Sequence, residues 1–456
     1  MSRPAHLFAV GGWLAAAAIA SGQRVATAQP DAAEFEFSGI QRSRYETIDE
    51  QFGNGLSGAD HVLALQTSLM FDLKLDKLQF FGEIMDSRGE LNDENSAVGT
   101  FLVNTLEPIQ AYAAWTLPDS LQEGGKSTLR VGRLTLDIGK RRLISRNRFR
   151  NTVSSFTGVD WQWQGAAGQN ARAVYLIPMR ILPNTFDELL DDDFELDRGQ
   201  RDSAVWGGFY QFPKGTRGDT VEVYGFRADA EGAATDPAAS WELWSVGTRV
   251  FRGAAKGRWN YELEAVAQTG ESGGVVAGTQ RRDLDHRAHL LHFEVGYQFD
   301  APWAPNLIFQ YDDASGDEEP LDGRSERFNT LFGDRRFEFT TTGIYGPFNR
   351  SNLSAQGLRV TLAPNPRLQG MLHYRSFRLA AARDTWVGIG ARDPTGRAGN
   401  SLGRQLEGSI TWAAIADRLT LEAGFEYLWF GRFAHQTGVA VNGDPTYVYL
   451  VATTRF

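Results

Sequence analysis

The sequence contains no cysteine, so neither a disulfide framework nor thiol chemistry can contribute to its fold or function. It also has no apolar run beyond its N-terminal segment that approaches the roughly 20 residues of a membrane-spanning helix. A linker rich in proline and serine and a sustained helical period are both missing. The net charge of −10 argues against a nucleic-acid partner. Because no linker divides the chain, we expect one continuous domain. The missing helical period indicates that this domain is not built from long helices.

The N-terminus has the three parts of a secretory signal. Met1 to Arg3 is short and basic, Leu7 to Ala20 is apolar, and Ala26-Thr27-Ala28 is a cleavage site of the small-x-small kind. The apolar part is shorter than a spanning helix needs, although a retained anchor is the alternative. We therefore expect residues 1–28 to be a signal peptide and residues 29–456 to be exported as one domain.

Segments of about ten residues then alternate apolar and polar side chains up to Phe456, a pattern typical of a transmembrane β-barrel. In Leu63 to Leu75 and again in Leu419 to Tyr427, every second residue is apolar and the others are largely polar. Because side chains on a strand point alternately to opposite faces, one face would meet lipid and the other water. A soluble sandwich also alternates, but 49 Gly, 12 Trp, 13 Tyr and 29 Phe suit the turns and aromatic girdles of a barrel.

The pattern predicts an all-β fold, a transmembrane antiparallel barrel of about 18 strands. Connections after even-numbered strands are short and those after odd-numbered strands are long, so we expect both termini in the periplasm and an aqueous bore that the long loops could plug or gate. The expected strands begin near Glu34, His61, Leu78, Glu107, Thr128, Ser155, Ala171, Ser203, Thr220, Trp241, Trp259, Arg287, Asn306, Gln356, Arg367, Gly403, Leu419 and Thr446.

Several motifs resemble the alginate export family of outer-membrane barrels. They are Leu129 to Ser145, Arg150-Asn151-Thr152, Phe156-Thr157-Gly158-Val159, Val103-Asn104-Thr105-Leu106, Tyr311 to Asp317, Asp322-Gly323-Arg324 with Phe328, and Tyr449 to Phe456. The resemblance covers nearly the whole mature chain. It implies an eighteen-stranded barrel in the bacterial outer membrane and passive passage of an anionic polysaccharide through an arginine-lined pore. The terminal Phe456 resembles the signal read by barrel-assembly machinery.

Arginine suits such a pore because its forked, permanently charged group binds carboxylates, and rings of Arg or Lys select anions. We expect the following residues on the polar phases of the strands to line the bore: Arg42, Arg44 with Glu46, Arg172, Arg180, Arg249, Arg359 and Arg375. Interior acids such as Asp160, Glu262, Glu264, Glu294, Glu407, Glu422 and Glu426 are expected to pair with them and to keep the wall rigid.

The densest basic segment follows the fifth strand and comprises Lys140, Arg141, Arg142, Arg146, Arg148 and Arg150. Folded into the bore, it would form an anion-selective constriction together with Arg130 or Arg133. A bulge at Gly132 would decide which of those two points inward. The alternative is a surface patch that binds lipopolysaccharide phosphates.

No enzyme activity and no cofactor are expected. Gly270 to Gly274 and Gly399 to Gly403 match G-x-S-x-G, but we expect both in outer loops, without the strand and helix of a nucleophile elbow. On one strand, His289 points away from His286 and His292, so the three cannot share a metal ion. Calcium could bind the acidic loops at 312–322 and 191–193, although solvated loops are the favoured explanation.

The sequence thus predicts an outer-membrane channel for anionic polysaccharide or small anionic solutes, with a general porin of broad specificity as the alternative. Its expected partners are outer-membrane lipids, lipopolysaccharide and periplasmic export components. We expect no nucleic-acid partner and a monomeric chain.

Overall fold

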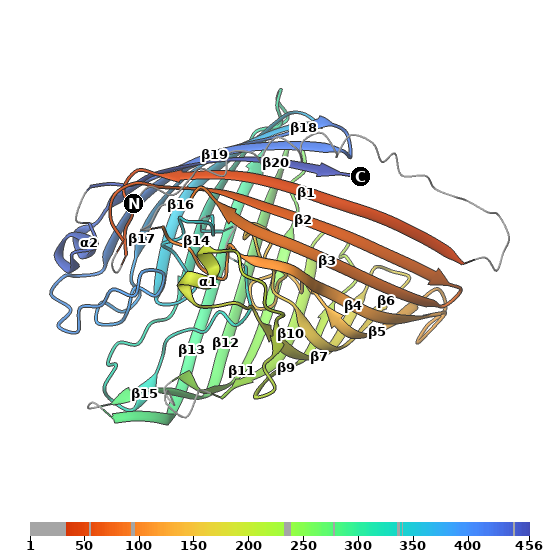
Figure 1. Ribbon diagram of the computed structural model, residues 1–456, viewed down its shortest axis with the longest axis horizontal. Helices are drawn as coiled ribbons and strands as arrows, with labels where there is room; N and C mark the ends of the chain where they lie inside the picture. Colours follow the sequence, from red (N-terminus) through yellow and green to blue (C-terminus); the bar gives the residue numbers. More distant parts are fainter. Residues whose placement is uncertain are drawn as a thin grey trace.

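A computed structural model describes residues 33–53, 56–92, 96–231, 239–276, 279–334, 338–339, 341–440 and 443–456. The expected signal peptide at residues 1–28 lies outside this described part. The described chain forms one antiparallel sheet that curls into a barrel, with the strands crossing the view obliquely in Figure 1.

Eighteen long strands form the wall, and two short strands and two short helices lie in the connections. The wall strands are β1 (Glu34–Ile48), β2 (Asp60–Leu75), β3 (Leu78–Glu90), β4 (Asn104–Pro118), β5 (Lys126–Leu134), β6 (Phe156–Gln164), β7 (Asn170–Arg180), β9 (Ser203–Gln211), β10 (Thr220–Ala230), β11 (Trp241–Arg252), β12 (Arg258–Val276), β13 (Thr279–Gln298), β14 (Asn306–Ala314), β16 (Leu353–Asn365), β17 (Leu368–Arg378), β18 (Ser401–Ile415), β19 (Leu419–Phe430) and β20 (Thr446–Arg455). The connections contain α1 (Phe186–Leu190), β8 (Arg198–Gly199), β15 (Arg324–Ser325) and α2 (Arg432–Thr437).

The barrel closes where the first strand meets the last. β1 pairs with β2 along one edge and with β20 along the other, so that Arg42 lies opposite Thr453. Gly39 and Phe456 exchange two backbone hydrogen bonds of 2.8 and 3.1 Å at the end of this seam. Closure leaves no unpaired sheet edge, as a strand-built membrane protein requires. The prediction of an eighteen-stranded antiparallel barrel is confirmed.

The strand positions agree with the predicted ones to within a few residues, with one exception. β13 begins at Thr279 and not near Arg287, because β12 and β13 form a long hairpin whose pairing continues past Gly274. Gly270 therefore lies within β12, and its predicted place in an outer loop is wrong.

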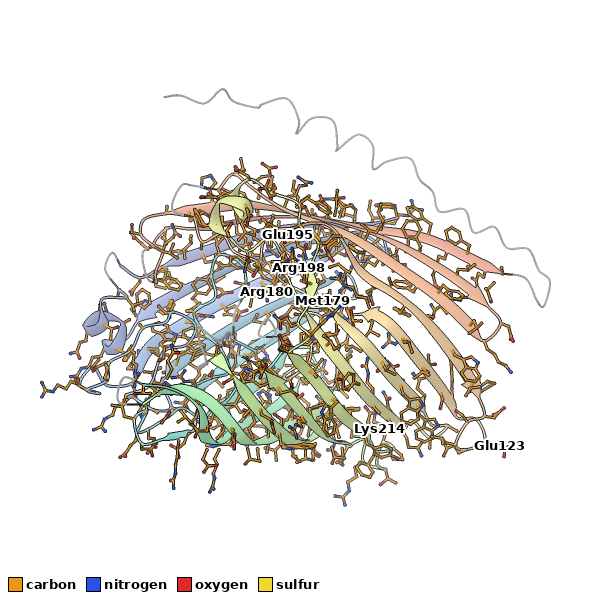
Figure 2. All side chains as sticks on the ribbon, turned by 60° about the horizontal axis from the view of Figure 1, so that its bottom comes forward. Glu123, Met179, Arg180, Glu195, Arg198 and Lys214 are labelled. Carbon is orange, nitrogen blue, oxygen red and sulfur yellow. The ribbon has the colours of Figure 1, made fainter. Side chains whose placement is uncertain are left out.

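The connections differ sharply between the two rims. One rim has the short turns, among them Asp76 and Lys77, and the other has the long loops at 135–155, 181–202, 315–352 and 379–400. Figure 2 shows Glu123 and Lys214, from two short turns, at one end of the molecule and away from Glu195 and Arg198 of a long loop. That the short-turn rim faces the periplasm stays a prediction.

The two faces of the wall differ as the alternation predicts. Large apolar side chains such as Phe37, Leu263 and Leu358 are exposed on the outside, where a membrane barrel meets lipid. Glu264 and Arg249, which are cross-strand partners, are buried on the inner face. No helix in the described ranges has the length and hydropathy needed to cross a membrane.

The bore is not uniformly polar, because several long loops pack into it. The wall residues Phe156, Leu176 and Phe226 form one buried cluster with Ile138 and Ile144 of the loop at 135–155. A second cluster joins the loops at 315–352, 379–400 and 431–445 to the wall from β16 to β20. The apolar residues of the inner face thus hold the loops in place by hydrophobic contact, and this role cannot be read from the alternation alone.

Candidate functional site

The loop at 135–155, named here the basic loop, crosses the bore between opposite walls. Arg42 on β1 donates to the backbone oxygens of Arg148 at 2.7 Å and Arg150 at 2.5 Å. From β7, Arg172 donates to the backbone oxygen of Asp137 at 2.8 Å. Because these donors point inward from separate strands, the basic loop lies inside the barrel.

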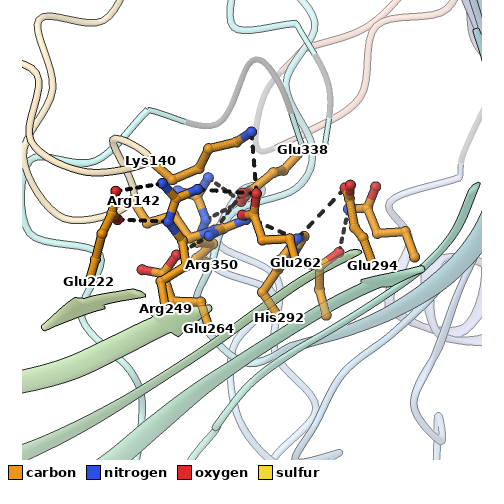
Figure 3. Close-up of polar contacts among 12 residues, drawn as sticks. Lys140, Arg142, Glu222, Arg249, Glu262, Glu264, His292, Glu294, Glu338 and Arg350 are labelled. Carbon is orange, nitrogen blue, oxygen red and sulfur yellow. Dashed lines mark hydrogen bonds and ion pairs between the residues drawn. The ribbon is translucent and has the colours of Figure 1, made fainter. Parts of the chain in front are cut away.

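Arg142 holds the basic loop to the barrel wall at β12. Its guanidinium contacts Glu262 at 2.7 Å and Glu338 at 2.5 Å, and it also pairs with Glu264. Only 2% of Arg142 is exposed, so these are buried charges that must be paired. Figure 3 shows Arg142 within this network, together with Lys140, which reaches Glu262 at 3.5 Å.

Glu338 belongs to the loop at 315–352, named here the second loop, which extends from the basic loop to the opposite wall. Asp334 N donates to the backbone oxygen of Arg141 at 2.9 Å, and Phe332 forms backbone hydrogen bonds with the basic loop. Farther along, Ile344 N donates to Glu46 on β1 at 2.9 Å. The two loops together form a layer across the bore. The sequence analysis gave plugging or gating of the bore by long loops as one possibility.

The wall arginines pair with interior acids. Asp160 on β6 accepts from Arg130 at 2.8 Å and from Arg172 at 2.6 Å. The other wall pairs are Arg44 with Glu46 at 2.7 Å, Arg359 with Glu294 at 2.8 Å, Arg375 with Glu407 at 2.8 Å and Arg249 with Glu222 at 2.8 Å. Such pairs fix the direction of each side chain and cancel much of its charge.

Arg130 and Arg133 lie on opposite faces of β5, and both reach acids. The pairing of β5 with its neighbours continues in register past Gly132, so the bulge considered there as a possibility is not formed. Arg130 meets Asp160 in the bore. Arg133, at the loop end of the strand, pairs with Glu107 and, at 2.8 Å, with Asp197 of the loop at 181–202.

Exposure separates the predicted arginines into two groups. Arg44, Arg142 and Arg375 are at most 2% exposed, so a passing solute cannot reach them and their role is to hold the structure. The partly exposed arginines are Arg42, Arg130, Arg133, Arg141, Arg146 and Arg359, and Arg148 is exposed. The sequence pattern does not distinguish the groups, because burial depends on where the two loops lie.

Among the described residues, no ion pair involves Arg42 or Arg150. By contrast, Arg146 pairs with Glu83 at 2.6 Å, and Arg148 pairs with Asp137 at 2.5 Å. Arg42 therefore has no carboxylate within ion-pair distance in this described part of the chain.

The remaining predicted sites are distributed as follows. His286 and His292 are buried on the inner face, whereas His289 is exposed and contacts Asp313 at 3.2 Å, so the three do not converge. In the acidic segment at 191–193, Asp192 accepts a hydrogen bond from Gly89 N at 3.2 Å. Sequence reasoning missed Glu83, Glu107 and Glu338 as partners of the arginines. Only Glu83 could have been found from the sequence, because it lies at a polar position of the alternating pattern of its strand.

The loop at 181–202 contains two acids whose titration should affect its docking. Burial and repulsion from Glu107 raise the pKa of Asp197 to about 6, and burial raises the pKa of Asp192 to about 6. A carboxyl group with a raised pKa binds its proton more tightly in the docked loop than in the free loop. Docking therefore weakens as the pH rises from about 4 to about 6, and then levels off.

This pH dependence can be measured with a dye on one cysteine introduced at the partly exposed Glu195, since the chain has no other cysteine. We expect higher dye anisotropy at pH 5 than at pH 7.5 because the loop is held more firmly. The double variant Asp192→Asn, Asp197→Asn should remove most of the difference. Equal anisotropy at both pH values in the unmodified background would contradict the prediction.

Barrels of solved structure share this architecture. OccAB1 of Acinetobacter baumannii matches with a TM-score of 0.58 at 11% identity, over 92% of this chain and 96% of that chain. OpdK of Pseudomonas aeruginosa matches with a TM-score of 0.56 at 12% identity, over 93% and 99%. A structure of OpdK with vanillate gives a TM-score of 0.56 at 14% identity, over 92% and 98%. No curated protein matches the chain.

The closed barrel, taken together with the family match that follows, identifies a transport channel of the bacterial outer membrane. The family model described as alginate export matches residues 34–447. The chain belongs to the alginate export family, as the motif resemblance implied.

Proposed function

We propose that this channel passes an anionic polysaccharide of the alginate type, or related small anions, through a constriction lined by partly exposed arginines. The observation that carries the proposal is Arg42, a wall arginine that donates to the backbone oxygens of the basic loop and has no carboxylate partner in the described ranges. Membership of the alginate export family supports the substrate class.

Passage requires attraction without tight capture. A polyuronate has one carboxylate per sugar, and two further arginines of the basic loop, the exposed Arg148 and the partly exposed Arg141, offer donors in addition to Arg42. Their own carboxylate partners, Asp137 and Asp334, weaken each contact. A carboxylate of the substrate can therefore exchange from one arginine to the next while remaining hydrated.

Small anions are the second candidate substrate, and the layer formed by the two loops favours them, because it obstructs a wide polymer more than a small solute. OpdK, which shares the fold, has been crystallised with vanillate, a small carboxylate. A general porin would instead show little preference for either sign of charge. We further propose that the short-turn rim faces the periplasm, that the exposed apolar belt contacts outer-membrane lipids and lipopolysaccharide, and that the chain acts as a monomer.

Reversal potentials in a potassium chloride gradient across planar bilayers test the proposal. The native channel should prefer chloride, and Arg42→Ala should lower the chloride-to-potassium permeability ratio about fivefold, which corresponds to about 1 kcal/mol. Arg287→Ala is the matched control, because this exposed arginine points outward from β13 and pairs with Asp285.

Alginate oligomers added to one chamber separate the two substrate classes. Transient interruptions of the current that shorten in Arg42→Ala support a polyuronate channel. Chloride preference without interruptions supports a channel for small anions. A native channel with no preference for chloride and no response to the oligomer would overturn the proposal in favour of a general porin.

A further inference from the structure

Six exposed arginines gather on one side of the rim that carries the long loops. They are named here the rim arginine patch and comprise Arg378 on β17, Arg404 on β18, Arg383, Arg392 and Arg397 of the loop at 379–400, and Arg432 on α2. In the described part of the chain, none of the six forms an ion pair. Figure 1 shows α2 at the end of the barrel away from the C-terminus. The patch therefore presents unpaired positive charge beside the long loops.

Direct contacts hold the loop arginines of the patch together. Arg392 Nε donates to the backbone oxygen of Arg383 at 3.0 Å, and Arg432 donates to the backbone oxygen of Arg397, also at 3.0 Å. Phe433, the next residue of α2, is buried in the second apolar cluster, which fixes the helix and the loop at 379–400 against the wall. The positions of these arginines are thus set by packing, although their charged ends are exposed.

The outer wall below the patch is built for lipid. Ile410 is exposed on the outward face of β18, and nearer the loops come Tyr374 and Trp429, whose rings lie 6.4 Å apart. Arg404 lies directly opposite Trp429 and also faces outward, because Gln405 next to it is buried on the inner face. Toward the long loops the wall therefore changes from apolar to aromatic to cationic. This order matches the acyl, interfacial and charged levels of a membrane leaflet.

The acidic residues close to the patch in the sequence do not neutralise it. Those of residues 378–404 and 431–446 are Asp384, Asp393 and Asp444. Asp384 pairs with Arg327, and the other two accept backbone hydrogen bonds. The loop at 181–202, by contrast, contains eight acidic residues and only two arginines. Because unpaired like charges repel one another, an anion bound at the patch lowers the electrostatic energy.

We propose that the rim arginine patch binds the phosphate groups of lipopolysaccharide. The inference goes beyond the proposed transport function but depends on the proposed orientation, with the long loops outside the cell. Lipopolysaccharide carries phosphates on the sugars directly above its acyl chains, so its chains can lie on the apolar wall while Arg378 and Arg404 bind the phosphates. Each guanidinium can form two parallel hydrogen bonds to a phosphate. Arg397 and Arg432, in the loops, are placed for phosphates of the core sugars.

A solute in the bore does not meet this part of the wall. On the same two strands, Arg375 and Glu407 are buried on the inner face, whereas Arg378 and Arg404 are exposed on the outer face. Replacing the outward arginines should therefore leave the chloride preference of the channel unchanged. In the same way, Arg42→Ala should change the chloride preference without changing lipid binding.

Native mass spectrometry of the full-length, detergent-folded protein with lipid A tests the patch. We expect bisphosphorylated lipid A to bind at least tenfold more tightly than lipid A from which both phosphates have been removed. The double variant Arg378→Gln, Arg404→Gln should lose this preference, at about fivefold per arginine. The matched control is Arg198→Gln, Arg201→Gln, which removes two exposed arginines of the acidic loop at 181–202 and should bind as the native protein does.

A second pair of replacements separates the two levels of the patch. Arg397→Gln, Arg432→Gln should weaken the binding of lipopolysaccharide with a phosphorylated core about tenfold and leave the binding of lipid A unchanged. Heat-modifiable migration in electrophoresis establishes that each variant is folded. If the double variant of Arg378 and Arg404 does not fold, Arg404→Gln alone decides the matter, with an expected loss of about fivefold.

The orientation is checked separately with a cysteine introduced at the exposed Arg392 and a membrane-impermeant maleimide applied to intact cells. Labelling of intact cells is expected. Labelling that requires lysis would overturn the orientation and this proposal together. With the orientation established, equal binding of the two forms of lipid A, or native binding by the folded double variant of Arg378 and Arg404, would overturn the lipopolysaccharide site and leave the transport proposal standing.

Discussion

Replacing Arg142 with methionine is expected to raise the single-channel conductance severalfold. The substitution removes the only cation that contacts Glu262, Glu264 and Glu338 together in the described structure. Glu262 keeps Arg249 and Glu338 keeps Arg350, but the buried Glu264 loses its only cationic partner among the described residues. Breaking a buried ion pair in this way costs about 3 to 5 kcal/mol. Because Glu338 belongs to the second loop and the other two to β12, the loops should separate from each other and from the wall.

Planar-bilayer recordings measure this effect, and Arg198→Met is the matched control. Arg198 pairs with Glu195 at 2.7 Å in an exposed position of the loop at 181–202, where a surface ion pair contributes about 0 to 1 kcal/mol. The control should conduct as the native channel does. If Arg142→Met also conducts at the native level while both loops stay protected from proteases, the pairing of Arg142 does not hold the loop layer together.

Replacing Gly158 with valine is expected to prevent most of the protein molecules from folding. Gly158 lies on β6 opposite Leu176 of β7, and an added Cβ would overlap the backbone oxygen of Tyr175. That oxygen belongs to the sheet and cannot move aside as a flexible side chain would. We expect a loss of about 3 kcal/mol or more of folding free energy, at the upper end of the range for overpacking.

The fraction of heat-modifiable, folded protein after refolding in detergent measures this loss. Gly82→Val is the control, because Gly82 lies within β3 and an added Cβ there meets nothing within 4 Å. The control should fold nearly as well as the native chain, since valine suits a strand. Equal folded fractions for the two variants would show that the close approach at Gly158 is easily relieved.

Much of the barrel was predictable because its determinants are local. Alternation in segments such as Leu63 to Leu75 reflects a wall with lipid on one side and water or polar groups on the other, and a strand cannot satisfy both with any other period. The start of β13 was missed for a related reason. The first residues of β13, from Thr279 to Asp285, are all polar except Leu284, so the alternation does not mark the start of the strand.

The site was predictable by residue type but not by role. Both Arg42 and Arg142 were expected to face the bore and attract anions. Arg42 is a partly exposed wall residue without an ion-pair partner in the described chain, whereas Arg142 is buried among three glutamates. The difference arises from contacts between residues more than a hundred positions apart, such as Arg142 with Glu264. No pattern within one strand encodes such a contact.

The amino-acid sequence by itself determined that this protein is a membrane barrel of eighteen strands whose side chains alternate between an apolar and a polar face, because strand periodicity and turn length are properties of neighbouring residues. Only the tertiary structure decided where the basic loop and the second loop lie, which arginines remain open to a solute, and that His292 meets Glu262, Glu294 and Asp312. Those outcomes depend on register between strands and on loops filling a bore, where burial and charge pairing are settled by the whole barrel at once.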